Sequence, residues 1–225
     1  MGITENIEKV LREIPENVTL LAAAKTRNAE EVKKAIDAGI THIGENYVQE
    51  AEKIIEALGE DARRVHWHMI GHLQTNKINK ALALFDVIQT VDSFKKAQAL
   101  SKRASTNKKL VSIYIEINIG SELSKSGLKP EFEMIKKIAL DISSLDWLKL
   151  EGIMTMGPLT AAPEELRPYF KKTKEIFDRI KDLNLKNVPM RTLSMGMSDS
   201  FRVAIEEGST MVRLGTILFG SRTYP

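Results

Sequence analysis

The feature that most constrains the fold is an alternation of short apolar runs with stretches of helical periodicity. Eight runs have the length and composition of buried strands; they begin near Thr19, Thr41, His66, Phe85, Leu110, Leu148, Met190 and Thr210. Helical patterns lie between them, over residues 29–38, 47–58, 93–105, 131–142 and 164–183. Strict strand–helix alternation favours a parallel sheet covered by helices, and eight units favour its closure into a barrel.

We therefore predict an α/β protein with a (β/α)8 (TIM) barrel in a single domain, preceded by an extra N-terminal helix. The helix is expected within residues 1–17 and the barrel within 18–225. An open doubly wound sheet is the alternative, but no glycine-rich dinucleotide fingerprint follows the first strand. Asn28 is expected to cap the helix that ends at Gly39, and Ser198 is expected to cap a later one.

The fifth strand supports closure through its alternating side chains. Its odd-numbered residues from Val111 to Ile119 are apolar, and its even-numbered residues are polar: Ser112, Tyr114, Glu116 and Asn118. In a closed barrel the polar face points inward, toward the mouth. A half-exposed edge strand has the same pattern, so both interpretations stay open at this point.

Charge and composition exclude several classes of function. The 33 basic and 30 acidic residues are interspersed, so neither a nucleic-acid nor a membrane partner is predicted. The absence of cysteine excludes disulfides, thiolate catalysis and cysteine-bound metals. We find no apolar run of signal-peptide or transmembrane length, and we expect a cytoplasmic location.

Lys25 is the first candidate functional residue, because catalytic groups in such barrels lie at the carboxyl ends of strands. It follows the small apolar stretch LLAAA and shares a strand face with Leu21 and Ala23. Burial there disfavours the ammonium form and makes the amine a nucleophile toward an aldehyde. The alternative is a lysine that ends a strand and points into water.

The ends of strands seven and eight form the second candidate, a phosphate site. LSMGMSDSF contains Ser194 and Met195, and MVRLGTILFG contains Arg213, Gly215 and Thr216. Barrels commonly bind phosphate after these two strands, at a helix N-terminus. Ser194 and Thr216 offer hydroxyl donors, and Gly215 allows close approach of the backbone. Ordinary turn chemistry is the alternative interpretation.

Two further features carry weaker signals. The loop over residues 120–130, with Lys125 in its middle, is longer than most strand–helix connections, and such loops are often functional. The alternative is a solvated, mobile loop. His66, His68 and His72 are clustered, but no acidic residue stands at metal-ligand spacing, so we predict structural histidines and no metal site.

Six ordered motifs carry a family resemblance across residues 19–222: LLAAAKT, IGENYVQEA, WHMIGHLQTNK, IEINIGSELSKSG, GIMTMG and LSMGMSDSFRVAIEEGSTMVRLGTILFGSR. Together they resemble the pyridoxal-phosphate homeostasis proteins. The resemblance implies a barrel similar to that of alanine racemase, the fold type III group, and pyridoxal 5′-phosphate (PLP) as cofactor.

The resemblance also implies roles for individual residues. Lys25 matches the lysine that forms a Schiff base with PLP, and Asn46 matches a residue beside the cofactor. Ser194, Gly215 and Thr216 match phosphate-binding positions. Arg213 matches the arginine that faces the pyridine nitrogen in the racemase. Lys125 matches a second lysine linked to cofactor transfer.

Two functions follow from these roles. The first is a non-catalytic protein that buffers PLP and delivers it to PLP-dependent apo-enzymes, and the second is an amino-acid racemase. Two-base racemisation requires an acid/base on each face of the substrate, and the sequence offers only Lys25 convincingly. Racemases of this fold also carry a second domain, whereas this chain stops at Pro225. We therefore predict a monomeric carrier; a Schiff-base aldolase ranks last.

Overall fold

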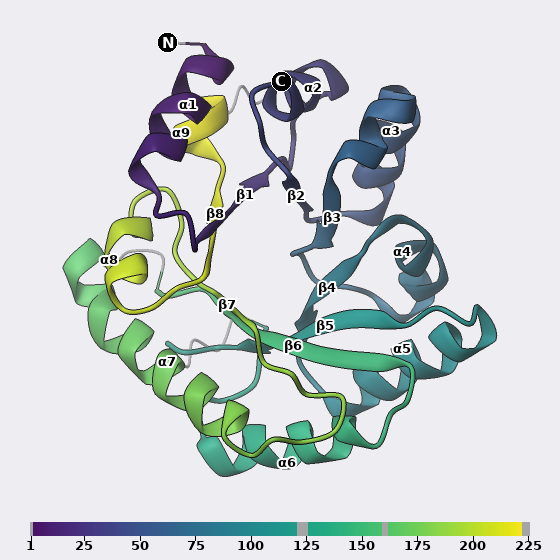
Figure 1. Cartoon of the computed structure of the whole chain (residues 1–225). Helices are drawn as coiled ribbons and strands as arrows, with labels where there is room; N and C mark the ends of the chain where they lie inside the picture. Colours follow the sequence, from purple (N-terminus) through teal and green to yellow (C-terminus); the bar gives the residue numbers. More distant parts are fainter. Residues whose placement is uncertain (1, 121–125, 159–161, 222–225) are drawn as a thin grey trace.

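Eight short strands pair in parallel, each with the next in sequence, and the last returns to the first (Figure 1). The computed structural model describes residues 2–120, 126–158 and 162–221. The predicted (β/α)8 barrel is thereby confirmed. Its strands are β1 (Thr19–Ala23), β2 (His42–Glu45), β3 (His66–Met69), β4 (Val87–Val91), β5 (Val111–Ile117), β6 (Leu148–Thr155), β7 (Thr192–Ser194) and β8 (Met211–Leu214).

Helices surround the barrel, as Figure 1 shows. They are α1 (Ile3–Glu13), α2 (Ala29–Asp37), α3 (Val48–Leu58), α4 (Ile78–Leu84), α5 (Phe94–Thr106), α6 (Phe132–Ser143), α7 (Arg167–Lys181), α8 (Phe201–Glu206) and α9 (Thr216–Phe219), with short 3-10 turns η1 (Gly59–Arg64), η2 (Thr75–Lys77) and η3 (Pro163–Leu166). The helix α4 was not predicted, because its seven residues give too short a periodic pattern. The N-terminal helix ends at Glu13, four residues before the expected limit of 17.

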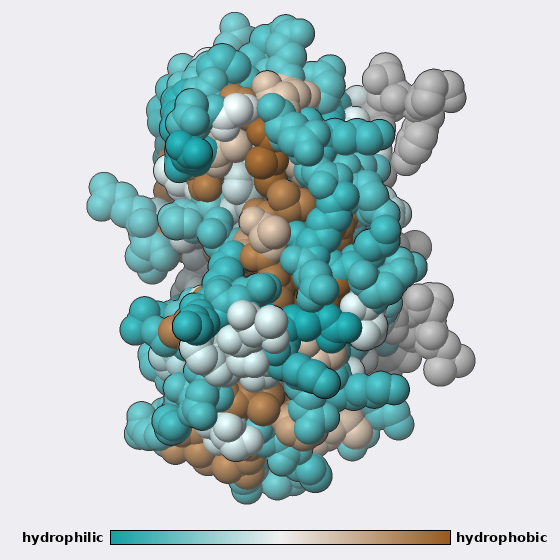
Figure 2. Space-filling model, turned by 90° about the vertical axis from the view of Figure 1, so that its right-hand side faces the viewer, coloured by the Kyte–Doolittle hydropathy of each residue, from teal (hydrophilic) through white to brown (hydrophobic). Residues whose placement is uncertain are grey.

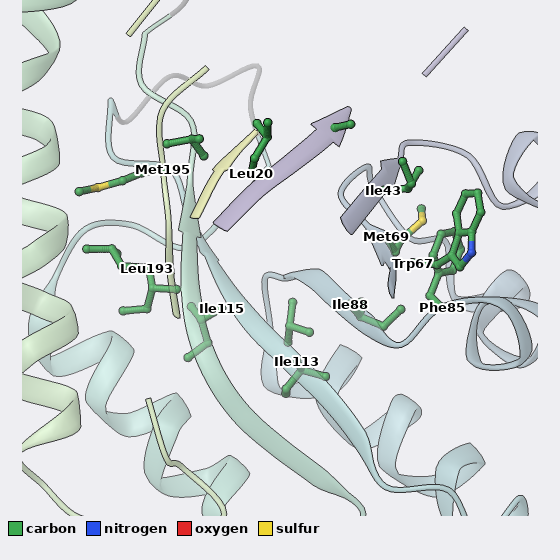
Figure 3. Close-up of a cluster of buried hydrophobic side chains, with 14 of the residues drawn as sticks. Leu20, Ile43, Trp67, Met69, Phe85, Ile88, Ile113, Ile115, Leu193 and Met195 are labelled. Atoms are coloured by element: carbon green, nitrogen blue, oxygen red, sulfur yellow. The ribbon is translucent and has the colours of Figure 1, made fainter. Parts of the chain in front are cut away.

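The main core lies between the outer face of the barrel and the helices. Figure 3 shows side chains of this layer, among them Ile43, Trp67, Ile88, Ile113 and Ile115. All five are at least 95% buried, so each contributes about 1.5–3 kcal/mol of apolar burial before the loss of chain entropy. This layer fixes the strands so that their opposite face points into the barrel.

A second, smaller cluster fills the barrel interior. It contains Leu21, Tyr114, Met154 and Met211. The odd-numbered residues of β5 belong to the outer core, whereas Tyr114 belongs to the inner cluster. The predicted alternation of the fifth strand is therefore confirmed, and the half-exposed edge strand is excluded because β5 pairs with both β4 and β6.

The helix starts follow the sequence at one of two expected positions. Asn28 caps α2: its side chain accepts from Glu31 N at 2.9 Å, and Glu31 Oε2 accepts from Asn28 N at 3.0 Å. Ser198 does not cap the next helix, because Ser200 precedes α8. Its hydroxyl instead accepts from Ile217 N, in the first turn of α9, at 3.4 Å.

The outer surface reflects this arrangement. The face turned toward the viewer in Figure 2 is mainly hydrophilic, with a hydrophobic band down its middle. Within the described ranges, no helix combines the length and the apolar character needed to span a membrane.

Candidate functional site

Lys25 lies two residues beyond the end of β1 and is half-buried. The chain turns sharply after it, since Thr26 has a φ of 67° and Arg27 N donates to Ala24 O at 2.9 Å. A β-branched residue in the left-handed region is strained, and such strain is concentrated at functional sites. The turn keeps Lys25 at the mouth of the barrel.

Two adjoining cavities open at this mouth, with volumes of about 190 and 310 Å³. The smaller is lined from the ends of β1, β7 and β8, and the larger is lined in addition from the ends of β2, β3, β5 and β6. Four residues line both cavities: Ala23, Lys25, Met197 and Arg213. The predicted lysine and arginine therefore stand where the two spaces meet.

The smaller cavity has the groups needed to hold an anion. Gly215, Thr216 and Ser198 line it, and the first turn of α9 begins at Thr216. Backbone N–H groups in a first helical turn lack intrahelical partners. A Cβ on Gly215 would lie 3.2 Å from the carbonyl oxygen of Ala23, so the glycine lets β8 pass close to β1.

Arg27 adds a cation to the smaller cavity. Its guanidinium donates to Glu31 Oε1 at 3.2 Å and to the carbonyl oxygen of Gly220 at 2.6 Å, and it stacks over the Phe219 ring at 5.4 Å. Its side chain is only 9% exposed. These contacts fix its position beside Thr216. The exposed carboxyl of Asp199 also lines this cavity, so its charge is mixed.

Arg213 is fixed by three hydrogen bonds to residues that line neither cavity. It donates from Nη1 to the carbonyl oxygen and the hydroxyl of Ser194, at 2.8 and 2.7 Å, and from Nη2 to the carbonyl oxygen of Thr155 at 2.8 Å. Burial lowers the pKa of Arg213 to about 10, while Glu116 raises it, so the side chain remains a cation at neutral pH. It presents this charge to both cavities.

The larger cavity contains a second ionisable group. Asn46, Gly71, His72 and Glu116 line it, together with Lys25. Burial and, to a smaller extent, Asp92 raise the pKa of Glu116 to about 7, and Lys96 and Arg213 oppose the rise. Glu116 is 4% exposed, and its Oε2 has no hydrogen-bond partner among the described residues. A carboxyl that titrates near neutrality therefore faces the space beside Lys25.

The structure brings together most of the residues expected from the sequence. Lys25, Asn46, Arg213, Gly215 and Thr216 line the cavities. Ser194 and Met195 are fully buried and line neither. The Ser194 hydroxyl donates to Gln89 Oε1 at 2.8 Å, and Met195 belongs to the outer core, as Figure 3 shows. Lys125 lies outside the described residues.

Sequence reasoning missed Arg27 and the role of Ser198 in the smaller cavity, and it gave Glu116 no role beyond the polar face of β5. Arg27 follows Lys25 by two residues, so its basic charge at the same strand end was the available signal. The environment of Glu116 had no such signal, because the charged groups around it come from distant parts of the chain. They are Asp92 after β4, Lys96 in α5 and Arg213 in β8.

The histidines are spread from the mouth of the barrel to its amino-terminal end. His68 Nε2 and His42 Nδ1 are 2.9 Å apart, whereas His72 lines the larger cavity. Burial lowers the pKa of His42 to about 4 and that of His68 well below its ordinary value. No group of three histidine or carboxylate side chains within the described ranges is arranged to hold a metal ion.

Comparisons with known proteins agree with this geometry. Residues 2–223 match the family model described as "Alanine racemase, N-terminal domain". A pyridoxal phosphate homeostasis protein from Haemophilus influenzae is 41% identical over 225 residues, 99% of this chain and 94% of its own length. One from Aquifex aeolicus is 40% identical over 205 residues, 91% of this chain and 87% of its own.

Solved structures give the same result. PipY from Synechococcus elongatus, with PLP bound, has a TM-score of 0.88 at 30% identity and covers 97% of this chain and 100% of its own. An alanine racemase from Clostridium difficile has a TM-score of 0.80 at 16% identity; the match covers 99% of this chain but 56% of the racemase, and it shows the fold alone. The chain therefore belongs to the pyridoxal phosphate homeostasis protein family, with the fold of the alanine racemase N-terminal domain.

Proposed function

We propose that this protein binds PLP at the mouth of its barrel, with Lys25 as the point of attachment, and that it buffers and delivers the cofactor. The observation that carries the proposal is that Lys25 and Arg213 line both mouth cavities. The names of the relatives and the PLP bound in PipY support the choice of cofactor.

The residues present fit PLP. A phosphate needs N–H and O–H donors and a cation, and the smaller cavity has Ser198, Thr216 and Arg27 for this purpose. A pyridine ring needs an apolar wall and a donor for its nitrogen. Met197, which lines both cavities, supplies the apolar wall, and Arg213 is the candidate donor to the ring nitrogen. We add Asn46 and Gly215 to the proposed contacts.

When bound, PLP supplies an aldehyde that condenses with primary amines and a ring that can act as an electron sink. Lys25 supplies the primary amine. Arg213 gives up a proton only at high pH, so as a donor it keeps the ring nitrogen unprotonated. An unprotonated nitrogen makes the ring a poorer electron sink. Because the racemase has a matching arginine, the choice of a carrier rests instead on the family to which the chain belongs and on the lack of a convincing second acid/base in the sequence.

Ser194 has a different place in this proposal from the one expected from the sequence. Its hydroxyl donates to Gln89 and accepts from Arg213. We therefore propose that it acts through Arg213; direct contact of Ser194 or Met195 with the phosphate remains an untested prediction.

The test is to trap the cofactor. Purified protein incubated with PLP should absorb in the visible range, and reduction with borohydride followed by peptide mapping should place the label on Lys25. Lys25→Ala should lose the label, whereas the exposed Lys34→Ala should retain it. A label elsewhere, or none, overturns the proposal, and alanine racemase activity in the same sample would favour the enzyme.

Delivery to apo-enzymes, a monomeric state and a cytoplasmic location extend the proposal. Delivery is tested by whether the loaded protein restores the activity of an apo-enzyme. Light scattering tests the monomeric state, and cell fractionation tests the location. Lys125→Ala is predicted to slow transfer without abolishing binding, and unchanged transfer kinetics would remove that role.

A further inference from the structure

A continuous line of hydrogen-bonded side chains crosses the barrel interior from Arg213 to His42. Arg213 Nη1 lies 2.7 Å from Ser194 Oγ, which lies 2.8 Å from Gln89 Oε1. Gln89 Nε2 is 2.9 Å from His68 Nδ1, and His68 Nε2 is 2.9 Å from His42 Nδ1. We call these five residues the barrel chain. They come from β8, β7, β4, β3 and β2, so only closure of the barrel brings them together.

The direction of every hydrogen bond in the barrel chain is fixed by chemistry. Arginine only donates, so the Ser194 hydroxyl accepts from it and sends its own hydrogen to the Gln89 carbonyl. The Gln89 amide nitrogen must then donate to His68 Nδ1. His68 is therefore neutral with its proton on Nε2, and it donates to His42.

Burial agrees with this pattern. Gln89 and Ser194 are fully buried, and His68 is 1% exposed. Desolvation keeps His68 neutral, as the lowered pKa indicates, and a neutral ring offers the one acceptor and one donor that the barrel chain requires. His42, at the far end, lines a separate cavity of about 240 Å³ beside the amino-terminal ends of β1 and β2.

The barrel chain determines which N–H bonds Arg213 has left. Of its five, two go to Ser194 and one to the carbonyl oxygen of Thr155. Within the part of the chain that the structure describes, the Nε hydrogen and one Nη2 hydrogen have no acceptor and remain for the cavity. The orientation of Ser194 thus sets the plane of the guanidinium.

We propose that Gln89 and His68 are positioning residues for cofactor binding, which hold Ser194 and, through it, aim Arg213 at the ring nitrogen. This inference rests on the proposed PLP site. Gln89 lines neither mouth cavity. It acts on Arg213 through two hydrogen bonds, from Ser194 to Gln89 and from Arg213 to Ser194.

The experiment compares Gln89→Leu with Ile88→Ala. Both positions are fully buried on β4, but Ile88 packs in the outer core while Gln89 points into the barrel. Gln89→Leu should weaken PLP binding by about tenfold, because Ser194 loses its acceptor and the hydrogen bond from Arg213 to Ser194 loses its geometry. The variant should also shift the visible absorption of the bound cofactor. Ile88→Ala should lower thermal stability and leave both properties unchanged. Gln89→Glu keeps an acceptor for Ser194 but removes the amide donor to His68 Nδ1, so it should recover only the part of the affinity that depends on Ser194.

A measurement on the unaltered protein covers the case in which Gln89→Leu does not fold. Nitrogen NMR of the imidazoles should show His68 as the neutral Nε2–H form, with signals that move on addition of PLP. A proton on Nδ1 overturns the barrel chain. Wild-type affinity and spectrum in Gln89→Leu, or an equal loss in Ile88→Ala, overturns the positioning role alone; absence of PLP on Lys25 in the wild type overturns the proposed function as well.

Discussion

Replacing Glu45 with glutamine should remove much of the pH dependence of this protein's stability. Glu45 ends β2 with its side chain fully buried, and neither carboxylate oxygen has a hydrogen-bond partner among the described residues. Burial and, to a smaller extent, Glu50 raise the pKa of Glu45 from 4.5 to about 8, and the backbone of Asn46 opposes the rise. The folded protein therefore holds this carboxyl in its protonated form at neutral pH.

The sign of the effect follows from proton binding. Above pH 4.5 the unfolded chain releases the Glu45 proton, while the folded protein retains it until about pH 8. The folded state then binds more protons, so stability is greatest below pH 4.5 and falls as the pH rises through this window. Each tenfold difference in proton affinity is worth about 1.4 kcal/mol, so the loss between pH 5 and pH 8 is about 3 kcal/mol.

The assay is thermal unfolding of the wild type and Glu45→Gln at several pH values over that range. For a chain of this size 1 kcal/mol corresponds to about 2–4 °C, so the wild type should lose about 6–12 °C relative to the variant. Glu56→Gln, at an exposed position of α3, is the control and should follow the wild type. Parallel curves for the wild type and Glu45→Gln would refute a buried, unpartnered carboxyl.

Two other substitutions test the mouth of the barrel. Glu116, whose pKa burial raises to about 7, ionises across neutrality in the larger cavity, which Lys25 also lines. PLP affinity measured by fluorescence titration should fall as the pH rises past 7, because a negative charge in this cavity disfavours an anionic ligand, and Glu116→Gln should flatten the profile. An equally steep profile in the variant would contradict the assignment. Gly71→Ala should weaken PLP binding and lower the free energy of unfolding by about 1–3 kcal/mol, because the new Cβ would overlap the carbonyl oxygen of Asn46. A variant with wild-type melting and affinity would show that the close contact between the segments after β2 and β3 is not required.

Much of the architecture could be predicted from the sequence, because it depends on local periodicity. The alternation of β5 separates the outer core from the barrel interior, and the eight apolar runs give the eight strands. Short elements were the exception: α4 has only seven residues, too few for a helical pattern to stand out.

The position of Lys25 at the mouth also followed from the sequence. In a parallel barrel all carboxyl ends of strands meet on one face, so the order of elements alone places Lys25, Asn46, Arg213 and Gly215 together. The family resemblance gave these residues a cofactor. Neither source could indicate how far each side chain is buried or which atoms it contacts.

Only the tertiary structure decided the partners of Ser194, the environment of Glu116 and the isolation of Glu45. Ser194 and Gln89 are 105 residues apart, and closure of the barrel buries both side chains completely, so each polar group must find its partner within the protein. Sequence periodicity determines which face of a strand a residue occupies. What meets that residue across the barrel depends on register and closure, and these are properties of the whole chain.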